Sequence, residues 1–183
     1  MAGWYRDRMS ERGYDPSLGD FAAVAASLWC GELRRGVALC GPTGSGKSVR
    51  LRILSRSLGV RMVHAVGLLD RLSRLEAGSQ DWRAAIGTGG WNDITNPRWR
   101  DLAIDDLGSE PESVSSWGNR RDVMERVLIE RHMAFEEHGA LTHVTTNLTW
   151  RQLSDRYGSR AASRLQQMCA LVPLVHDDWR AMR

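Results

Sequence analysis

The sequence predicts an α/β protein in which helices flank a five-stranded parallel sheet on both faces, giving three layers. Two observations predict this fold. Short apolar runs of strand length alternate with longer segments whose apolar residues recur every three or four positions. The first strand-to-helix junction also carries a complete phosphate-binding loop, G-x-x-x-x-G-K-[ST], at residues 41–48. Such alternation joins parallel strands by right-handed crossovers.

The first half of the chain follows this alternation closely. A polar extension at residues 1–18 is followed by apolar residues at helical spacing and then by a short apolar run before the loop. After the loop, isoleucine and leucine side chains recur as they would in a helix packed on a sheet. The expected order is helix 19–30, strand 36–40, helix 49–58, strand 60–66 and helix 68–75.

The second half resumes the pattern after an interruption. Residues 78–100 mix glycine, asparagine, aspartate, serine and proline with tryptophan, which predicts an irregular segment. The long helix at 121–138 is expected to turn Val123, Val127, Leu128 and Phe135 inward. The expected order after the irregular segment is strand 102–104, helix 121–138, strand 141–146, helix 150–169 and strand 171–175. We expect one domain over residues 1–183.

Composition excludes several classes of protein. Cys30, Cys40 and Cys169 are scattered, which argues against a disulfide framework or a zinc site and favours a reducing, cytoplasmic setting. No apolar run approaches the roughly 20 residues that span a membrane, so no membrane association is expected. The net charge of +3 permits a nucleic-acid partner without requiring one. Every basic side chain is arginine except Lys47, which lies inside the loop.

The loop itself predicts a binding site for ATP and Mg²⁺. Backbone N–H groups of a glycine-rich loop and of the following helix bind phosphate oxygens. Lys47 is expected to bridge the β- and γ-phosphates, and the Ser48 hydroxyl to hold Mg²⁺. An arginine fork would not replace the compact lysine ammonium in such a loop. The expected nucleotide-binding residues are Gly41, Pro42, Thr43, Gly44, Ser45, Gly46, Lys47, Ser48 and Val49.

Polar residues at the ends of two later strands complete the predicted site. Asp105 ends an apolar strand, where a bound magnesium nucleotide needs a carboxylate. Asp106 is placed to orient or deprotonate the attacking water, and Glu110 is a second candidate for that role. Asn147 ends the next strand and could hydrogen-bond the γ-phosphate and the water. The plainer alternatives are an acidic turn for the aspartates and a turn or helix cap for Asn147.

Together these motifs resemble the DnaC-like and IstB-like branch of the AAA+ ATPases, the bacterial and phage helicase loaders and transposition helpers. The resemblance covers about residue 19 to the end of the chain. The stretches that carry it are residues 35–40, 104–108, 142–148, 156–160 and 163–165, with 117–120 and 176–180 resembling phage and mobile-element versions.

The resemblance implies a role for each matching residue. Asp105 resembles the Walker B magnesium carboxylate, Asp106 occupies the place of the catalytic glutamate, and Asn147 resembles sensor 1. Because Asp106 is one methylene shorter than glutamate, hydrolysis is expected to be slow. The family's C-terminal helical lid is expected to be absent or vestigial.

The same resemblance implies that the site is shared between subunits. Arg164 resembles the arginine finger that acts in trans on a neighbouring subunit's nucleotide, with Arg160 as the reserve candidate. Arg180 resembles the sensor 2 arginine that acts within its own subunit. These roles imply a homo-oligomer assembled in the presence of ATP.

Three functions remain open at this stage. The first is an ATPase that assembles on single-stranded DNA and serves a replicative helicase or a transposase of a phage or mobile element. In it the 79–100 segment, through Trp82, Arg83, Trp91, Arg98, Trp99 and Arg100, would supply stacking planes and cations. A solvated loop is the plainer account of that segment. The second function is a nucleotide-dependent scaffold with little turnover, and the third is a small-molecule kinase.

Overall fold

The computed structural model describes residues 35–89, 101–111 and 120–174, with side chains of the last segment described from residue 123. Its five strands form one sheet in the order β2-β3-β4-β1-β5, and every pairing is parallel. The strands are β1 (Gly36–Cys40), β2 (Arg61–His64), β3 (Leu102–Asp105), β4 (Thr142–Thr146) and β5 (Cys169–Pro173). The predicted five-stranded parallel sheet is therefore confirmed.

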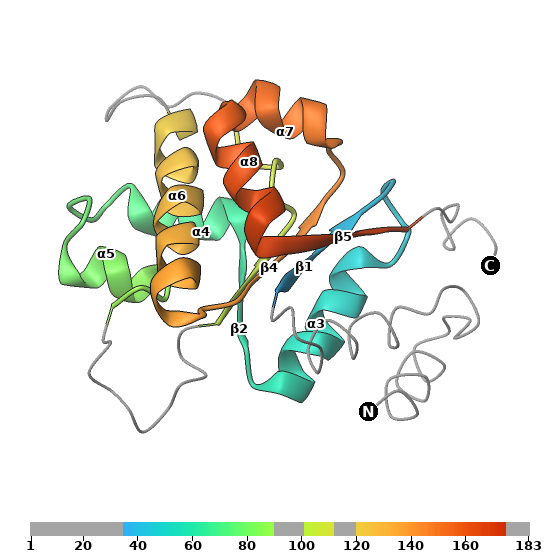
Figure 1. Ribbon diagram of the computed structural model, residues 1–183, viewed down its shortest axis with the longest axis horizontal. Helices are drawn as coiled ribbons and strands as arrows, with labels where there is room; N and C mark the ends of the chain where they lie inside the picture. Colours follow the sequence, from blue (N-terminus) through green and yellow to red (C-terminus); the bar gives the residue numbers. More distant parts are fainter. Residues whose placement is uncertain (1–34, 90–100, 112–119, 175–183) are drawn as a thin grey trace.

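Helices cover both faces of the sheet, as the prediction of three layers requires (Figure 1). The helices are α3 (Lys47–Leu58), α4 (Ala65–Leu72), α5 (Gln80–Ala85), α6 (Arg120–His138), α7 (Trp150–Tyr157) and α8 (Ser159–Met168). Strand side chains alternate between two apolar clusters. Val37 and Leu39 pack with α3, whereas Ala38 packs with α4 to α8 on the opposite face.

Parallel pairing brings the carboxyl ends of the strands to one edge. His64 of β2 pairs with Asp105 of β3, and Cys40 of β1 pairs with Thr146 of β4. The loop that follows β1 and the polar residues that follow β3 and β4 therefore meet at this edge, where open parallel sheets bind ligands.

The predicted boundaries of two elements at β2 and after it are wrong. The strand expected at 60–66 ends at His64, and the helix expected at 68–75 begins at Ala65 and ends at Leu72. The His64 ring accepts a hydrogen bond from the Val66 amide over 3.4 Å, so the last residue of the strand is also the N-cap of the helix.

Three further predictions need correction. The segment expected to be irregular contains α5, which begins after Ser79 because the Ser79 hydroxyl accepts from the Trp82 amide over 3.2 Å. The single helix expected at 150–169 is two helices, because Gly158 adopts φ 87° between them. As α8 ends at Met168, β5 begins two residues earlier than expected.

The predicted inner face of α6 is confirmed, but it omits one buried residue. Val127 and Leu128 are fully buried, and Val123 and Phe135 pack against the core at its margin. Arg131, which the apolar pattern did not include, is also fully buried. The predicted extension and helix of residues 1–30 lie outside the described residues, as do Cys30 and the last residue of the predicted final strand.

Candidate nucleotide-binding site

The phosphate-binding loop has the backbone that its glycines predict. Gly44 and Gly46 have φ of 83° and 81°, which side-chain-bearing residues rarely adopt. A Cβ on Gly41 would lie 2.3 Å from the Leu174 carbonyl oxygen. Gly46 is the N-cap of α3, and glycine has no side chain to accept hydrogen bonds from the first helical amides. Those amides and the helix dipole are therefore directed at whatever anion the loop holds.

Lys47 lies across this loop. Its ammonium nitrogen Nζ donates to the carbonyl oxygens of Gly41, at 2.8 Å, and Pro42, at 2.6 Å. The side chain is buried, and burial lowers the pKa of Lys47, while Asp106 and Asp105 act in the opposite direction. A buried ammonium bound to neutral carbonyls gains from an ionised acceptor, so phosphate oxygens are well-matched ligands for it.

A second cationic side chain, from α3, contacts the loop. Arg50, in the first turn of α3, is buried and donates to the Ser45 carbonyl over 2.7 Å. This contact fixes the loop immediately before Lys47. Sequence patterns alone do not single out Arg50, although it stands three residues after Lys47 within the predicted helix.

The two aspartates lie where β3 ends. The Asp105 carboxylate is buried, and its Oδ1 accepts from the Thr145 hydroxyl over 2.6 Å. Asp106 has φ 55° and is the one non-glycine residue with positive φ among those that the structure describes. Its Oδ2 lies 3.4 Å from Nε2 of His64. Since the His64 Nδ1 accepts from the Val66 amide, Nε2 carries a proton toward Asp106.

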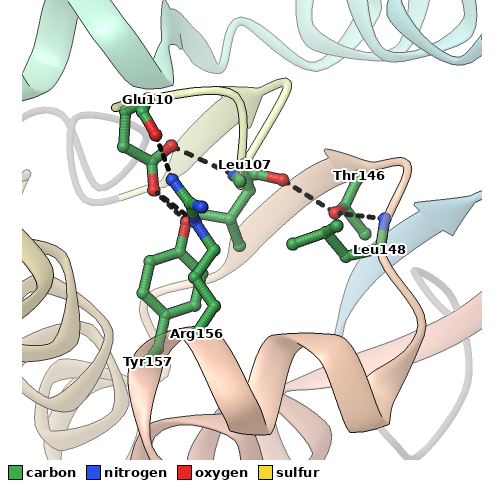
Figure 2. A network of polar contacts seen from close by, with 7 residues as sticks. Leu107, Glu110, Thr146, Leu148, Arg156 and Tyr157 are labelled. Atoms are coloured by element: carbon green, nitrogen blue, oxygen red, sulfur yellow. Dashed lines mark hydrogen bonds and ion pairs between the residues drawn. The ribbon is translucent and has the colours of Figure 1, made fainter. Parts of the chain in front are cut away.

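Glu110 has a structural role and not the catalytic one considered from the sequence. Its carboxylate is buried, accepts from the Gly108 amide over 3.0 Å and lies 3.4 Å from Nε of Arg156. Figure 2 shows Arg156 and Tyr157 converging on it. The Tyr157 hydroxyl also donates to Glu110 Oε1, and burial and then the Glu110 charge raise the pKa of Tyr157. Both carboxylate oxygens are thus engaged within the protein.

Asn147 follows β4 directly and is exposed at the carboxyl edge. The residue before it, Thr146, fixes the turn, because its hydroxyl donates to the Leu107 carbonyl over 2.7 Å and accepts from the Leu148 amide over 3.0 Å (Figure 2). The Thr146 carbonyl in turn accepts from the Gly41 amide over 3.3 Å. Asn147 therefore begins a turn that is tied to β3 and to the phosphate-binding loop.

Arg164 and Arg160, two of the three arginines predicted to act on the nucleotide, lie on α8. Helix α8 leads directly into β5, whose first residue, Cys169, pairs with Gly36 at the amino end of β1. Arg164 is partly exposed in the second half of α8, on the way to this opposite edge, and donates to Gln167 over 2.8 Å. Arg160 is exposed in the first turn of α8. Arg180 lies outside the described residues.

Trp82 does not offer a stacking plane to a nucleic-acid base. It is only 2% exposed and packs in the core, and the guanidinium of Arg126 lies 5.5 Å from the centre of its ring. Arg83 beside it is exposed. The remaining tryptophans and arginines of the predicted DNA-binding segment, Trp91, Arg98, Trp99 and Arg100, lie outside the described residues.

The residues present fit a magnesium nucleotide. Mg²⁺ in nucleotide sites takes only one or two protein ligands, and its remaining ligands are phosphate oxygens and water. Ser48 in the first turn of α3 and Asp105 at the end of β3 are residues of the type that could supply that small ligand set. Within the described part of the chain, no group of three or more metal-binding side chains competes with this site.

Comparison with solved structures shows the same fold. No family model and no curated protein sequence matches the chain. The structure of DnaI is 21% identical, with a TM-score of 0.55 over 76% of this chain and 73% of DnaI. The DnaC helicase loader is 21% identical, with a TM-score of 0.56 over 88% of this chain and 91% of that one.

A third solved structure is the replication initiator DnaA bound to AMPPCP and single-stranded DNA. It is 18% identical, with a TM-score of 0.51 over 86% of this chain and 46% of DnaA. The chain therefore shares the fold of these solved structures, as the resemblance of its motifs predicted. Among the described helices, none combines the length and the apolar character needed to cross a membrane.

Proposed function

We propose that the protein binds and hydrolyses ATP at this edge of the sheet. The observation that carries the proposal is the meeting of a complete phosphate-binding loop with two carboxylates, one from the last residue of β3 and one from the residue after it, whose charges act on the buried Lys47 ammonium. Lys47 binds the β- and γ-phosphates, and Ser48 and Asp105 hold Mg²⁺. When bound, Mg²⁺ neutralises charge on the phosphate oxygens.

The remaining residues act on the water that attacks the γ-phosphate. Asp106 orients this water and accepts its proton, and Asn147 donates hydrogen bonds from its amide to the γ-phosphate. Aspartate reaches about one methylene less far than glutamate, and a misplacement near 1 Å costs roughly 10²-fold in rate. We therefore propose slow hydrolysis.

We further propose that the chain works as an oligomer in DNA replication, in the manner of a helicase loader. In this proposal Arg164 of one subunit completes the site of the next. Its position in α8 is away from its own phosphate-binding loop, and its side chain is partly exposed, so that a neighbouring subunit could reach it. Arg160 is the reserve for this role, and Arg180 is proposed to act within its own subunit. The solved DnaC helicase loader and the DnaA complex with single-stranded DNA support this direction through their shared fold.

The proposed partners are single-stranded DNA and the replicative helicase or transposase of a phage or mobile element. Because Trp82 is buried, stacking on DNA bases in this proposal depends on residues outside those described. A second candidate function is a nucleotide-dependent scaffold with little turnover. The contact between His64 and the short Asp106 side chain favours it, because a carboxylate held by a histidine is less available to a water.

A complementation experiment tests the shared site. ATP turnover and mass are measured with and without single-stranded DNA for the wild type, Lys47→Ala and Arg164→Ala. Each variant alone is expected to lose turnover, by roughly 10³-fold for Arg164→Ala. Mixing the two variants pairs an intact Lys47 with an intact Arg164 at some interfaces, so part of the turnover is expected to return. Arg151→Ala, which removes an exposed arginine of α7, is the control.

The outcomes separate the proposals. DNA-stimulated turnover that returns on mixing supports the ATPase with a trans finger. Nucleotide-dependent assembly without turnover would favour the scaffold. A monomer in every nucleotide state would overturn the shared site. An oligomer that shows no recovery on mixing would exclude Arg164 as the finger, and the same experiment with Arg160→Ala then tests the reserve candidate.

A further inference from the structure

Thr145 of β4 connects both acidic residues of the site. Its side chain is fully buried, and its hydroxyl oxygen lies 2.6 Å from Asp105 Oδ1 and 2.8 Å from the Asp106 amide nitrogen. Its own carbonyl accepts from the Leu107 amide over 2.8 Å. A single residue of the neighbouring strand therefore holds three consecutive residues at the end of β3.

The direction of these hydrogen bonds is fixed by chemistry. The Asp106 amide can only donate, so the Thr145 oxygen is its acceptor, and the hydroxyl proton is left to donate to Asp105. An ionised carboxylate is the stronger acceptor for that proton. With Oδ1 bound to Thr145, the Asp105 side chain cannot rotate freely, and Oδ2 is the oxygen left to bind a metal ion.

The same hydroxyl supports the unusual backbone of Asp106. A residue with a side chain is strained at φ 55°, and such a conformation persists only where its surroundings hold it. The Asp106 amide is held by Thr145 Oγ1, and the next amide by the Thr145 carbonyl. This backbone turn determines where the Asp106 carboxylate points.

Neighbouring threonines of β4 do not share this geometry. The Thr142 hydroxyl accepts from Arg131, and the Thr146 hydroxyl bonds to the backbone at Leu107 and Leu148. Thr145 is thus distinguished from the other two by a hydroxyl that contacts a carboxylate of the site.

We propose that Thr145 is a positioning residue that holds two groups in place at the same time: the magnesium-binding carboxylate of Asp105 and the backbone of the water-orienting Asp106. This proposal rests on the proposed ATPase function. It adds that β4, which also leads to Asn147, fixes the β3 carboxylates relative to the phosphate-binding loop. Groups that orient metal ligands are typically worth 10- to 100-fold in metal affinity or activity.

The test compares Thr145→Val and Thr145→Ala, which lack the hydroxyl, with Thr145→Ser, which keeps it. AMPPCP binding is titrated at a series of Mg²⁺ concentrations and without Mg²⁺, and kcat and KM for ATP are measured separately. Removing the hydroxyl is expected to raise the Mg²⁺ concentration at half-maximal AMPPCP binding, the Mg²⁺ midpoint, by roughly 10-fold or more. It is expected to lower kcat by roughly 10-fold or more as well. Binding without Mg²⁺ is expected to stay within about twofold, and serine to restore both parameters.

Thr88→Val is the matched control, because Thr88 is also buried but its hydroxyl bonds to the Arg83 carbonyl, away from the site. Thermal unfolding of each variant identifies those that fold; if valine prevents folding, alanine carries the test. A wild type that does not bind AMPPCP would refute the proposed function itself. A wild type that binds, with valine or alanine variants that keep its Mg²⁺ midpoint and kcat, would overturn the role of Thr145 alone, as would a serine variant as defective as valine.

Discussion

Replacing Glu110 tests the network that joins the end of β3 to α7. The Glu110 side chain is 2% exposed and that of Arg156 is 13% exposed, so neither charge has full access to water. In Glu110→Ala the Arg156 guanidinium loses its carboxylate, and the buried Tyr157 hydroxyl loses its acceptor (Figure 2). Removing one partner of a buried ion pair is strongly destabilising, because the other group stays buried without that contact.

The size of the loss follows from this burial. Breaking a buried pair costs about 3 to 5 kcal/mol. Because Arg156 retains some exposure, we expect the lower part of this range, about 3 kcal/mol. For a chain of this length, each kcal/mol lowers the melting temperature by about 2 to 4 °C, so the expected decrease is on the order of 10 °C. Glu110→Gln keeps an acceptor for Tyr157 and is expected to cost about half as much.

An exposed ion pair on α6 supplies the control. Arg126 and Glu130 lie 2.7 Å apart, closer than Arg156 and Glu110, but their side chains are 46% and 20% exposed. Such i,i+4 surface pairs contribute about 0.3 to 0.5 kcal/mol. Chemical denaturation of Glu110→Ala and Glu130→Ala, read by circular dichroism, compares the two. Equal losses within about 0.5 kcal/mol would refute the argument that burial sets the value of the Glu110 network.

Two further predictions concern the sheet. Burial, and secondarily the charge of Arg131, lowers the pKa of His143 from 6.5 to about 4. Because the unfolded state then binds a proton at a higher pH than the folded state, the free energy of unfolding decreases as the pH falls from 6.5 to 4, by up to about 3 kcal/mol. Urea unfolding of the wild type and of His143→Asn at pH 4.5 and 7 measures this loss, which the variant should lack. An equal decrease in the free energy of unfolding for the two proteins would contradict the prediction. Gly36→Ala would place a Cβ 1.6 Å from the Thr142 carbonyl oxygen, whereas Gly67 in α4 has open space. We expect Gly36→Ala to cost at least about 3 kcal/mol and Gly67→Ala to stabilise by about 0.5 kcal/mol; comparable melting temperatures would be inconsistent with this geometry.

Local chemistry explains which features the sequence predicts well. The phosphate-binding loop needs glycine where φ is positive and lysine at one position, so eight consecutive residues identify it without tertiary information. Strands β1, β3 and β4 are continuous buried runs, as expected for a parallel sheet covered on both faces. Their ends also locate Asp105 and Asn147 at one edge.

Features that depend on tertiary neighbours were missed. Trp82 lies in a segment whose composition is that of a loop, yet its ring is buried among apolar side chains of distant elements. Arg131 interrupts the apolar face of α6, but its guanidinium donates to carbonyls of Ile86 and Gly87 and to the Thr142 hydroxyl. A buried cation is tolerated only where such acceptors converge, and periodicity within one helix cannot reveal acceptors on other segments.

The order of the strands explains why Thr145 was the hardest site residue to predict. Asp105 and Thr145 are forty residues apart, and only the placement of β4 between β3 and β1 brings them into contact. From that central position β4 bonds to both sides, since Thr145 holds Asp105 and the Thr146 carbonyl accepts from the Gly41 amide. A displacement of β4 would therefore move the Asp105 carboxylate and the start of the phosphate-binding loop together. The residues at the end of β4 thus hold both parts of the proposed site in position. For this reason we expect the loss of the Thr145 hydroxyl to affect Mg²⁺ binding and not only stability.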